Sequence, residues 1–149
     1  MPTTPILTSR FGRLEIESLD VICFPAGLLG LDGCLHWVLL ADADNDAVGW
    51  LQATTQADVA LAVVSPRRFV PDYQVRVNRS ELEPLGLDLK NKVSVLAIVS
   101  SNEHQLTLNL KAPLIIHRER RLGRQVIVNG EEPLQYELVS DHSNRKRIA

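Results

Sequence analysis

Apolar and polar residues alternate at three places along the chain, which is the pattern of strands with one buried face. The alternation covers residues 13–17, 73–77 and 105–110. Continuous apolar runs rich in β-branched residues occupy residues 59–64, 93–99 and 126–128 and predict strands buried on both faces. Residues 36–40 and 48–52 predict a further pair, joined by an acidic turn at residues 41–46. About ten short strands separated by turn signals predict an all-β sandwich or barrel.

Helical patterns are sparse. Residues 78–86 carry the best one, in which Ser80 is a candidate N-cap and Gly86 a candidate C-terminal stop. Pro84 limits this helix to one or two turns, because an interior proline forfeits a helix hydrogen bond. The prediction is therefore a mainly all-β fold with one or two short helical turns.

Composition predicts a single soluble domain. The chain has 149 residues, of which 45% are hydrophobic and 23% charged, enough for one continuous core. We expect this domain to span residues 1–140 and the polar residues 141–149 to form a flexible tail. The apolar runs are too short to cross a bilayer, and the N-terminal residues do not resemble a signal peptide. Cys23 and Cys34, without a C-x-x-C motif, predict reduced thiols and a cytoplasmic location.

Two segments partly match ligand-binding motifs. Residues 42–46 begin like a calcium loop, but Ala47 and Ala53 stand where an EF-hand needs glycine and a bidentate acid. A solvated hairpin turn is the better interpretation. Gly27, Gly30 and Gly33 follow a predicted strand, yet their spacing matches no phosphate-binding loop and no helix opens after them.

Catalytic and metal-binding patterns are weak as well. The four histidines are scattered singly, without the spacing of metal ligands, and no serine or cysteine lies in a nucleophile-elbow context. We therefore expect no enzymatic activity, no metal, no cofactor and no small-molecule substrate.

Three apolar stretches are interrupted by proline and glycine in a way that a plain core strand does not need. They are residues 24–31, 69–73 and 109–116. Proline fixes φ and removes a backbone donor, whereas glycine permits conformations that other residues avoid. These stretches predict shaped loops that contact a protein partner. The candidate contact residues are Phe24, Pro25, Gly27, Leu28, Phe69, Pro71, Asp72, Tyr73, Asn109 and Pro113.

Two arginine clusters leave an alternative open, namely an RNA-binding β-barrel module. The first cluster spans residues 118–124 around the turn at Gly123, and the second spans residues 145–147. RNA binders usually combine a basic face with aromatic side chains, but only 5% of this chain is aromatic. The net charge of −2 also implies no general attraction to nucleic acid or to an anionic membrane. A solvated hairpin and a soluble tail are therefore favoured, and no direct nucleic-acid binding is expected.

The order of landmarks between about residue 10 and residue 128 resembles the FliW family of bacterial flagellar assembly factors. The landmarks are Phe11-Gly12 with Glu15-Ile16, Ile22-Cys23-Phe24-Pro25 with Gly27-Leu28 and Gly30, Val38-Leu39-Leu40, Trp50-Leu51-Gln52, Leu61-Ala62-Val63-Val64, Pro66, Phe69 with Pro71-Asp72-Tyr73, Leu85-Gly86, Asn109-Leu110 with Ala112-Pro113, and Gly123 with Gln125-Val126.

The chain departs from the family pattern at a few positions. The family typically has an acidic residue at Ala26, a proline at Leu29, an aromatic at Leu31 and apolar or neutral residues at Arg67 and Arg68. The basic residues 145–147 are also unusual. These positions bear on affinity for a partner more than on the fold.

The resemblance implies a small, mostly antiparallel β-barrel that is not an enzyme. It implies a cytoplasmic protein that binds flagellin before export and, when released, binds the translational regulator CsrA and relieves repression of its target messages. Because the chain is only mildly acidic, it is a poor mimic of RNA phosphate. We therefore expect CsrA to be bound outside its RNA groove, with coupling between the two ligands.

Overall fold

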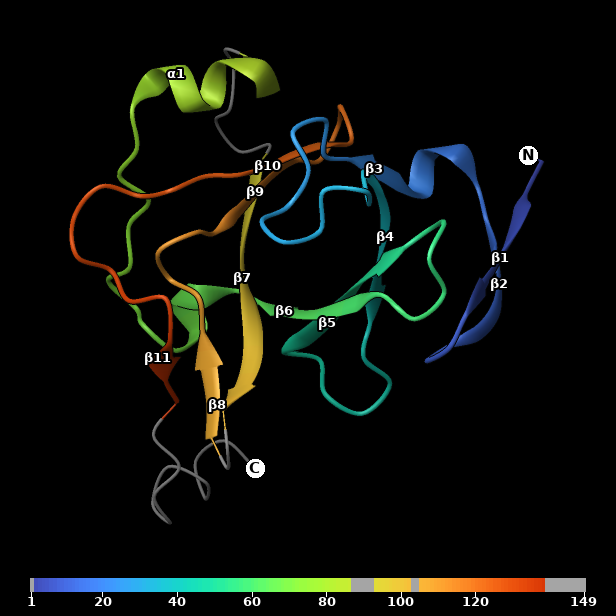
Figure 1. The fold of residues 1–149 in the computed structure, drawn as a ribbon, viewed down its shortest axis with the longest axis horizontal. Helices are drawn as coiled ribbons and strands as arrows, with labels where there is room; N and C mark the ends of the chain where they lie inside the picture. The colour runs from blue at the N-terminus through green and yellow to red at the C-terminus, as the bar shows by residue number, and fades with distance from the viewer. Residues whose placement is uncertain (1, 87–92, 103–104, 139–149) are drawn as a thin grey trace.

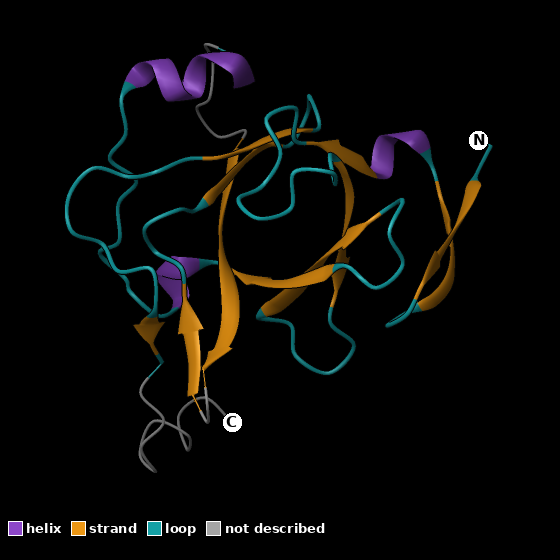
Figure 2. Cartoon of the chain, viewed as in Figure 1, coloured by secondary structure: helices purple, strands orange, loops and turns teal. Residues whose placement is uncertain are grey.

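The computed structural model describes residues 2–86, 93–102 and 105–138. Within these residues strands dominate, and the helical content is one short α-helix and three 3-10 turns (Figures 1 and 2). This confirms the predicted mainly all-β fold. The elements are β1 (Thr4–Thr8), β2 (Gly12–Ile16), η1 (Ser18–Asp20), β3 (Val21–Cys23), β4 (His36–Ala41), β5 (Val48–Ala53), β6 (Ala60–Val64), η2 (Pro66–Arg68), α1 (Arg79–Leu82), η3 (Glu83–Leu85), β7 (Val93–Asn102), β8 (Gln105–Leu108), β9 (Leu114–His117), β10 (Leu122–Gln125) and β11 (Tyr136–Glu137).

Seven of these strands close into a barrel in the order β7-β6-β5-β4-β3-β10-β9, with β9 returning to β7. Every pairing in the ring is antiparallel except that of β3 with β10, which is parallel and rests on Cys23 opposite Leu122. The ring is visible face-on in Figure 2. Closure pairs the backbone N–H and C=O groups that the edge strands of an open sheet would leave exposed. The predicted small, mostly antiparallel barrel is confirmed.

The long strand β7 branches the sheet. Its first four residues pair with β9, Ala97 and Ile98 pair with β6, and its last four residues pair with β8. Leu96 lies opposite Leu114 whereas Val99 lies opposite Leu108, so residues 109–113 stand opposite only two residues of β7. This third proline-containing stretch is therefore a bulge that breaks the returning strand into β8 and β9.

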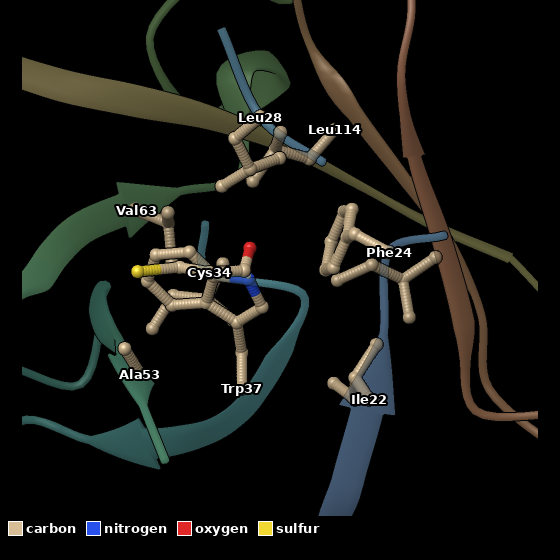
Figure 3. Packing of buried hydrophobic residues seen from close by; sticks show 10 residues of the cluster. Ile22, Phe24, Leu28, Cys34, Trp37, Ala53, Val63 and Leu114 are labelled. Carbon is tan, nitrogen blue, oxygen red and sulfur yellow. Dashed lines mark hydrogen bonds between the residues drawn. The ribbon is translucent and has the colours of Figure 1, made fainter. Parts of the chain in front are cut away.

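The barrel interior is filled by aliphatic and aromatic side chains that converge from β3, β4, β5, β6 and β9 (Figure 3). The side chains of Ile22, Phe24, Trp37, Leu51 and Leu114 are fully buried. A second cluster lies outside the ring, where Leu85 of η3 packs with Ile115, Val126 and Val128.

The β1–β2 hairpin packs against the outside of the barrel, through Ile6 and Ile16 against Val38. Strand β1 was not predicted, because Pro5 interrupts its pattern. The tip of the hairpin holds Phe11 edge-on to Trp50, with ring centroids 6.1 Å apart.

The acidic segment at residues 42–46 is the predicted hairpin turn between β4 and β5. The Asp42 carboxylate accepts hydrogen bonds from the Asp44 and Asn45 amides at 3.1 and 3.0 Å, and from the Trp50 indole at 2.9 Å. These bonds, the indole bond first, lower the pKa of Asp42 below its ordinary value. Hydrogen bonds from the turn backbone and from the Trp50 indole stabilise the turn.

The short helix forms where predicted but begins differently. The residue that precedes α1 is Asn78, and Ser80 lies inside the helix, so the prediction of Ser80 as N-cap is wrong. Glu83 and Pro84 continue as η3, and Gly86 ends it with a φ of 116°. Pro84 and Gly86 therefore have the predicted roles.

Two predicted strands are not strands in the structure, namely residues 73–77 and 126–128. Both segments alternate buried and exposed residues, and their backbones bond to irregular partners. The predicted burial of residues 126–128 on both faces is therefore also wrong, because Ile127 is 49% exposed. The Val126 and Val128 amides donate to Pro113 and Lys111, and the Asn129 amide donates to Arg76. The valines of these segments pack in the outer cluster, which explains their pattern. The bulge at residues 109–113 offers their backbones no regular ladder of hydrogen bonds to join.

Candidate partner-binding surface

The loop that follows β3, residues 24–35, is here called the cap loop. It lies across one opening of the barrel (Figure 1, light blue). Its first turn is closed by a 2.8 Å hydrogen bond from the Gly27 amide to the Phe24 carbonyl, with Pro25 in the second position and Gly27 at a φ of 73°. Further bonds from Leu31 to Leu28 and from Cys34 to Leu31 follow. A chain of such turns holds the loop in one shape.

Three side chains of the cap loop enter the barrel, and Cys34 is one of them. Phe24 and Leu28 join the interior cluster with Trp37 and Leu114 (Figure 3). The Phe24 ring lies directly against Gly123 of β10, where an added Cβ would stand only 2.4 Å from the ring. Glycine is therefore required at position 123 by close approach, because any side chain would occupy the space of the ring.

Gln125 ties the cap loop to the bulge. Its Oε1 accepts a hydrogen bond from the Leu29 amide at 2.8 Å, and its Nε2 donates to the Ala112 carbonyl at 3.1 Å. The bulge is also closed internally, since the Ala112 amide donates to Asn109 Oδ1 at 2.9 Å. The Leu29 backbone is held by the bond to Gln125, while the residue is 66% exposed.

The second proline-containing stretch, residues 69–73, follows η2 and packs on the bulge. The buried Tyr73 hydroxyl donates to the Leu110 carbonyl at 2.7 Å, and the Tyr73 carbonyl accepts from Arg67 Nε at 2.9 Å. Burial, with a smaller contribution from the charge of Glu132, raises the pKa of Tyr73 to about 12. Tyr73 thus joins two of the three predicted stretches.

The structure divides the ten candidate contact residues by exposure. Phe24, Gly27, Leu28, Tyr73 and Pro113 are buried, Phe69 and Asn109 are half-buried, and Pro25, Pro71 and Asp72 are exposed. The buried residues shape the loops, whereas the exposed ones are free to touch a partner. The bulge connects to the cap loop through Gln125 and to residues 69–73 through Tyr73.

A shallow groove of about 240 Å³ lies beside the cap loop. Its lining residues come from the cap loop, from η3 and from β10: Pro25, Ala26, Pro84, Leu85, Leu122, Gly123 and Arg124. Of these, only Pro25 was a predicted contact residue. The others come from separate segments of the sequence, of which the Pro84-Leu85-Gly86 turn and the arginine cluster at residues 118–124 carried local signals.

The arginine hairpin at residues 118–124 is anchored to the body of the protein. Its turn lies at residues 118–121, where Arg121 has a φ of 52°, and Gly123 belongs to β10, so the prediction of a turn at Gly123 is wrong. Arg124 Nη2 forms an ion pair with Glu81 Oε2 at 3.0 Å, Arg120 Nη1 donates to the Leu85 carbonyl at 3.2 Å, and Arg121 Nη2 donates to the Asp20 carbonyl at 3.2 Å. These bonds join the hairpin to α1, η3 and η1. The second cluster, residues 145–147, and the tail at residues 141–149 lie outside the described residues.

The described part of the chain contains no group of three or more histidine, cysteine, aspartate or glutamate residues placed to hold a metal ion. Within those same residues, no helix has the length and apolar character needed to cross a membrane. Cys23 and Cys34 are both free thiols.

Comparison with known proteins agrees with this geometry. The sequence model of the FliW protein family matches residues 5–138. A flagellar assembly factor FliW from Bdellovibrio bacteriovorus is 34% identical over 125 residues, which cover 83% of this chain and 71% of that protein. Another, from Natranaerobius thermophilus, is 29% identical over 148 residues, covering 97% and 98% of the two chains.

A solved structure supports the same assignment. The crystal structure of a flagellar assembly factor FliW superposes with a TM-score of 0.85 at 26% identity and covers 93% of this chain and 99% of that one. The likeness therefore extends through the barrel and its loops. The chain belongs to the FliW family of flagellar assembly factors.

Proposed function

We propose that this protein binds unassembled flagellin in the cytoplasm and, when flagellin leaves, binds CsrA and relieves its repression of target messages. It acts by binding, without catalysing a reaction. Family membership carries this proposal. The cap loop, which exposes Leu29 and contributes Pro25 and Ala26 to an apolar groove, is the surface that fits it best. Flagellin ends in amphipathic helices, so an unassembled subunit exposes apolar stripes that a groove can cover.

Flagellin capture is expected to depend on Leu29. Purified protein should retain the flagellin of its own cell in a pull-down at micromolar concentration, and Leu29→Asp should weaken retention about tenfold or more, because it places a charge in an apolar contact. Leu134→Asp is the matched control, since Leu134 is 61% exposed and Leu29 is 66% exposed.

Two results would count against this surface. Wild-type protein that retains no flagellin at micromolar concentration contradicts the proposed function itself. Equal retention by the Leu29→Asp and Leu134→Asp variants leaves the function intact but places the contact elsewhere than the cap loop.

CsrA is expected to be inhibited by coupling rather than by occupation of its RNA groove. The chain has a net charge of only −2, and its arginine hairpin is unsuited to mimic phosphate. Excess target RNA should therefore fail to restore RNA binding fully, and a complex of all three components should be detectable by native gel shift or mass photometry. Complete rescue by RNA without such a complex would show simple competition.

Direct RNA binding through the arginine hairpin is the alternative. It predicts an affinity for RNA that falls steeply between about 50 and about 200 mM salt, because phosphate contacts release counterions. All four arginines in the hairpin, Arg118 included, bond to the protein itself, which weakens this alternative. Filter binding with an unrelated acidic protein as the reference distinguishes the two functions.

A further inference from the structure

The groove beside the cap loop is built from three separate segments. Strand β10 forms its floor at residues 122–124, Pro25 and Ala26 form one wall, and Pro84 and Leu85 form the other. The walls hold their positions because Phe24 is buried against Gly123 on one side and Leu85 is buried in the outer cluster on the other. The groove is therefore preformed.

The lining is apolar except for Arg124. Pockets that enclose drug-sized ligands measure roughly 300–1,000 Å³, whereas this groove of about 240 Å³ is smaller. Its size and lining suit an aliphatic side chain that projects from a protein segment. A small-molecule substrate would find few polar groups to fix its orientation.

Positive charge borders the groove unevenly. Arg124 is neutralised by its ion pair with Glu81. At the Leu85 end, the exposed Arg120 uses Nη1 to hold the Leu85 carbonyl and, among the described side chains, pairs with no carboxylate. Its remaining donors make this end complementary to an acidic group.

We propose that this groove receives an aliphatic side chain of unassembled flagellin, with a neighbouring carboxylate of the same segment bound by Arg120. The inference rests on the proposed function and assigns the arginine hairpin a role in it. Flagellin is favoured over CsrA as the occupant, because a protein that binds RNA phosphates carries positive charge, which the charge of Arg120 at the Leu85 end would repel.

The test measures flagellin and CsrA binding separately by calorimetry. Ala26→Arg fills the groove from an exposed turn position and should weaken flagellin binding about tenfold or more while leaving CsrA binding unchanged. The matched control is Ala43→Arg, which places the same side chain at an exposed position of the β4–β5 turn.

The charge component is tested with Arg120→Gln, which keeps a donor for the Leu85 carbonyl and removes the positive charge. Flagellin binding should weaken several-fold and lose part of its salt dependence. Arg13→Gln is the control, because Arg13 is an exposed arginine of β2 outside the groove.

Each other outcome overturns the inference. If the wild-type protein binds neither flagellin nor CsrA, the proposed function and the inference fail together. If it binds flagellin and Ala26→Arg behaves like Ala43→Arg, the inference alone fails. Weakened binding of CsrA alone, or an RNA affinity that Arg120→Gln abolishes, would assign the groove to a different ligand.

Discussion

Gly123→Ala is expected to lower the free energy of unfolding by about 3 kcal/mol, the upper part of the range for overpacked cores. The added Cβ would lie 2.4, 2.5 and 2.8 Å from three atoms of the Phe24 ring. The ring is fully buried in the barrel interior and packed within the interior cluster. Relief therefore requires β10 or the cap loop to shift. Urea denaturation followed by tryptophan fluorescence measures the loss.

The matched control is Gly33→Ala, in which the new Cβ meets no atom within 4 Å. It should change stability by no more than about 0.5 kcal/mol. Adding Phe24→Leu to Gly123→Ala should recover part of the lost free energy of unfolding, because the smaller side chain leaves room for the methyl group. The coupling energy between the two substitutions should be roughly 0.5–3 kcal/mol. Additive effects, or a Gly123→Ala variant as stable as Gly33→Ala, would contradict the close approach.

Because Pro25 and Ala26 follow Phe24, the Gly123→Ala variant should also bind partners more weakly.

Tyr73→Ala is expected to cost about 3–5 kcal/mol, the usual range for truncating a buried aromatic side chain. Tyr73 is 4% exposed and packs with Val64, Ala97, Leu108 and Leu110. Tyr73→Phe keeps the ring but leaves the Leu110 carbonyl without its 2.7 Å bond, at a cost of about 1–3 kcal/mol. Tyr136→Phe, at a half-buried position on β11, is the control.

The contribution of the Tyr73 hydroxyl should depend on pH in a defined direction. The pKa of Tyr73 is raised from 10.0 to about 12 in the folded protein, so folding favours the neutral phenol. The stabilisation is fully present below the unfolded-state pKa of about 10 and is lost as pH rises toward the folded value. The stability difference between wild type and Tyr73→Phe should therefore shrink between these pH values. A difference that stays constant would mean that the hydroxyl titrates alike in both states.

Local patterns were sufficient where a strand pairs with its neighbour in sequence. The strands β4 and β5 were predicted from their apolar runs and from the acidic turn between them, whose carboxylate and amide groups bond the turn backbone. The short helix that Gly86 ends was predicted for the same reason, because both depend on residues only a few positions apart. Residues 73–77 show the limit of such patterns, because their alternation indicated which side chains are buried and not whether the segment pairs with a strand.

The sequence could not separate residues that shape the binding surface from residues that touch a partner. Phe24 and Pro25 are adjacent, yet one is fully buried in the barrel and the other is exposed on a groove wall. Both are apolar or conformationally restricted residues in the same turn, so residue type alone does not indicate which of the two is buried. Their difference depends on Gly123, about one hundred positions away in the chain, which leaves room for the ring.

The sequence by itself determined the all-β class, the turns at Pro25-Ala26-Gly27 and Pro84-Leu85-Gly86, and the family, because each depends on local stereochemistry or on the order of landmarks. The tertiary structure alone decided the closure of the barrel and the position of the groove. Closure depends on one parallel contact between β3 and β10 and on the return of β9 to β7 across the bulge. The groove brings residues 25–26, 84–85 and 122–124 together. Contacts between such distant segments depend on packing of the whole chain, which no local pattern encodes.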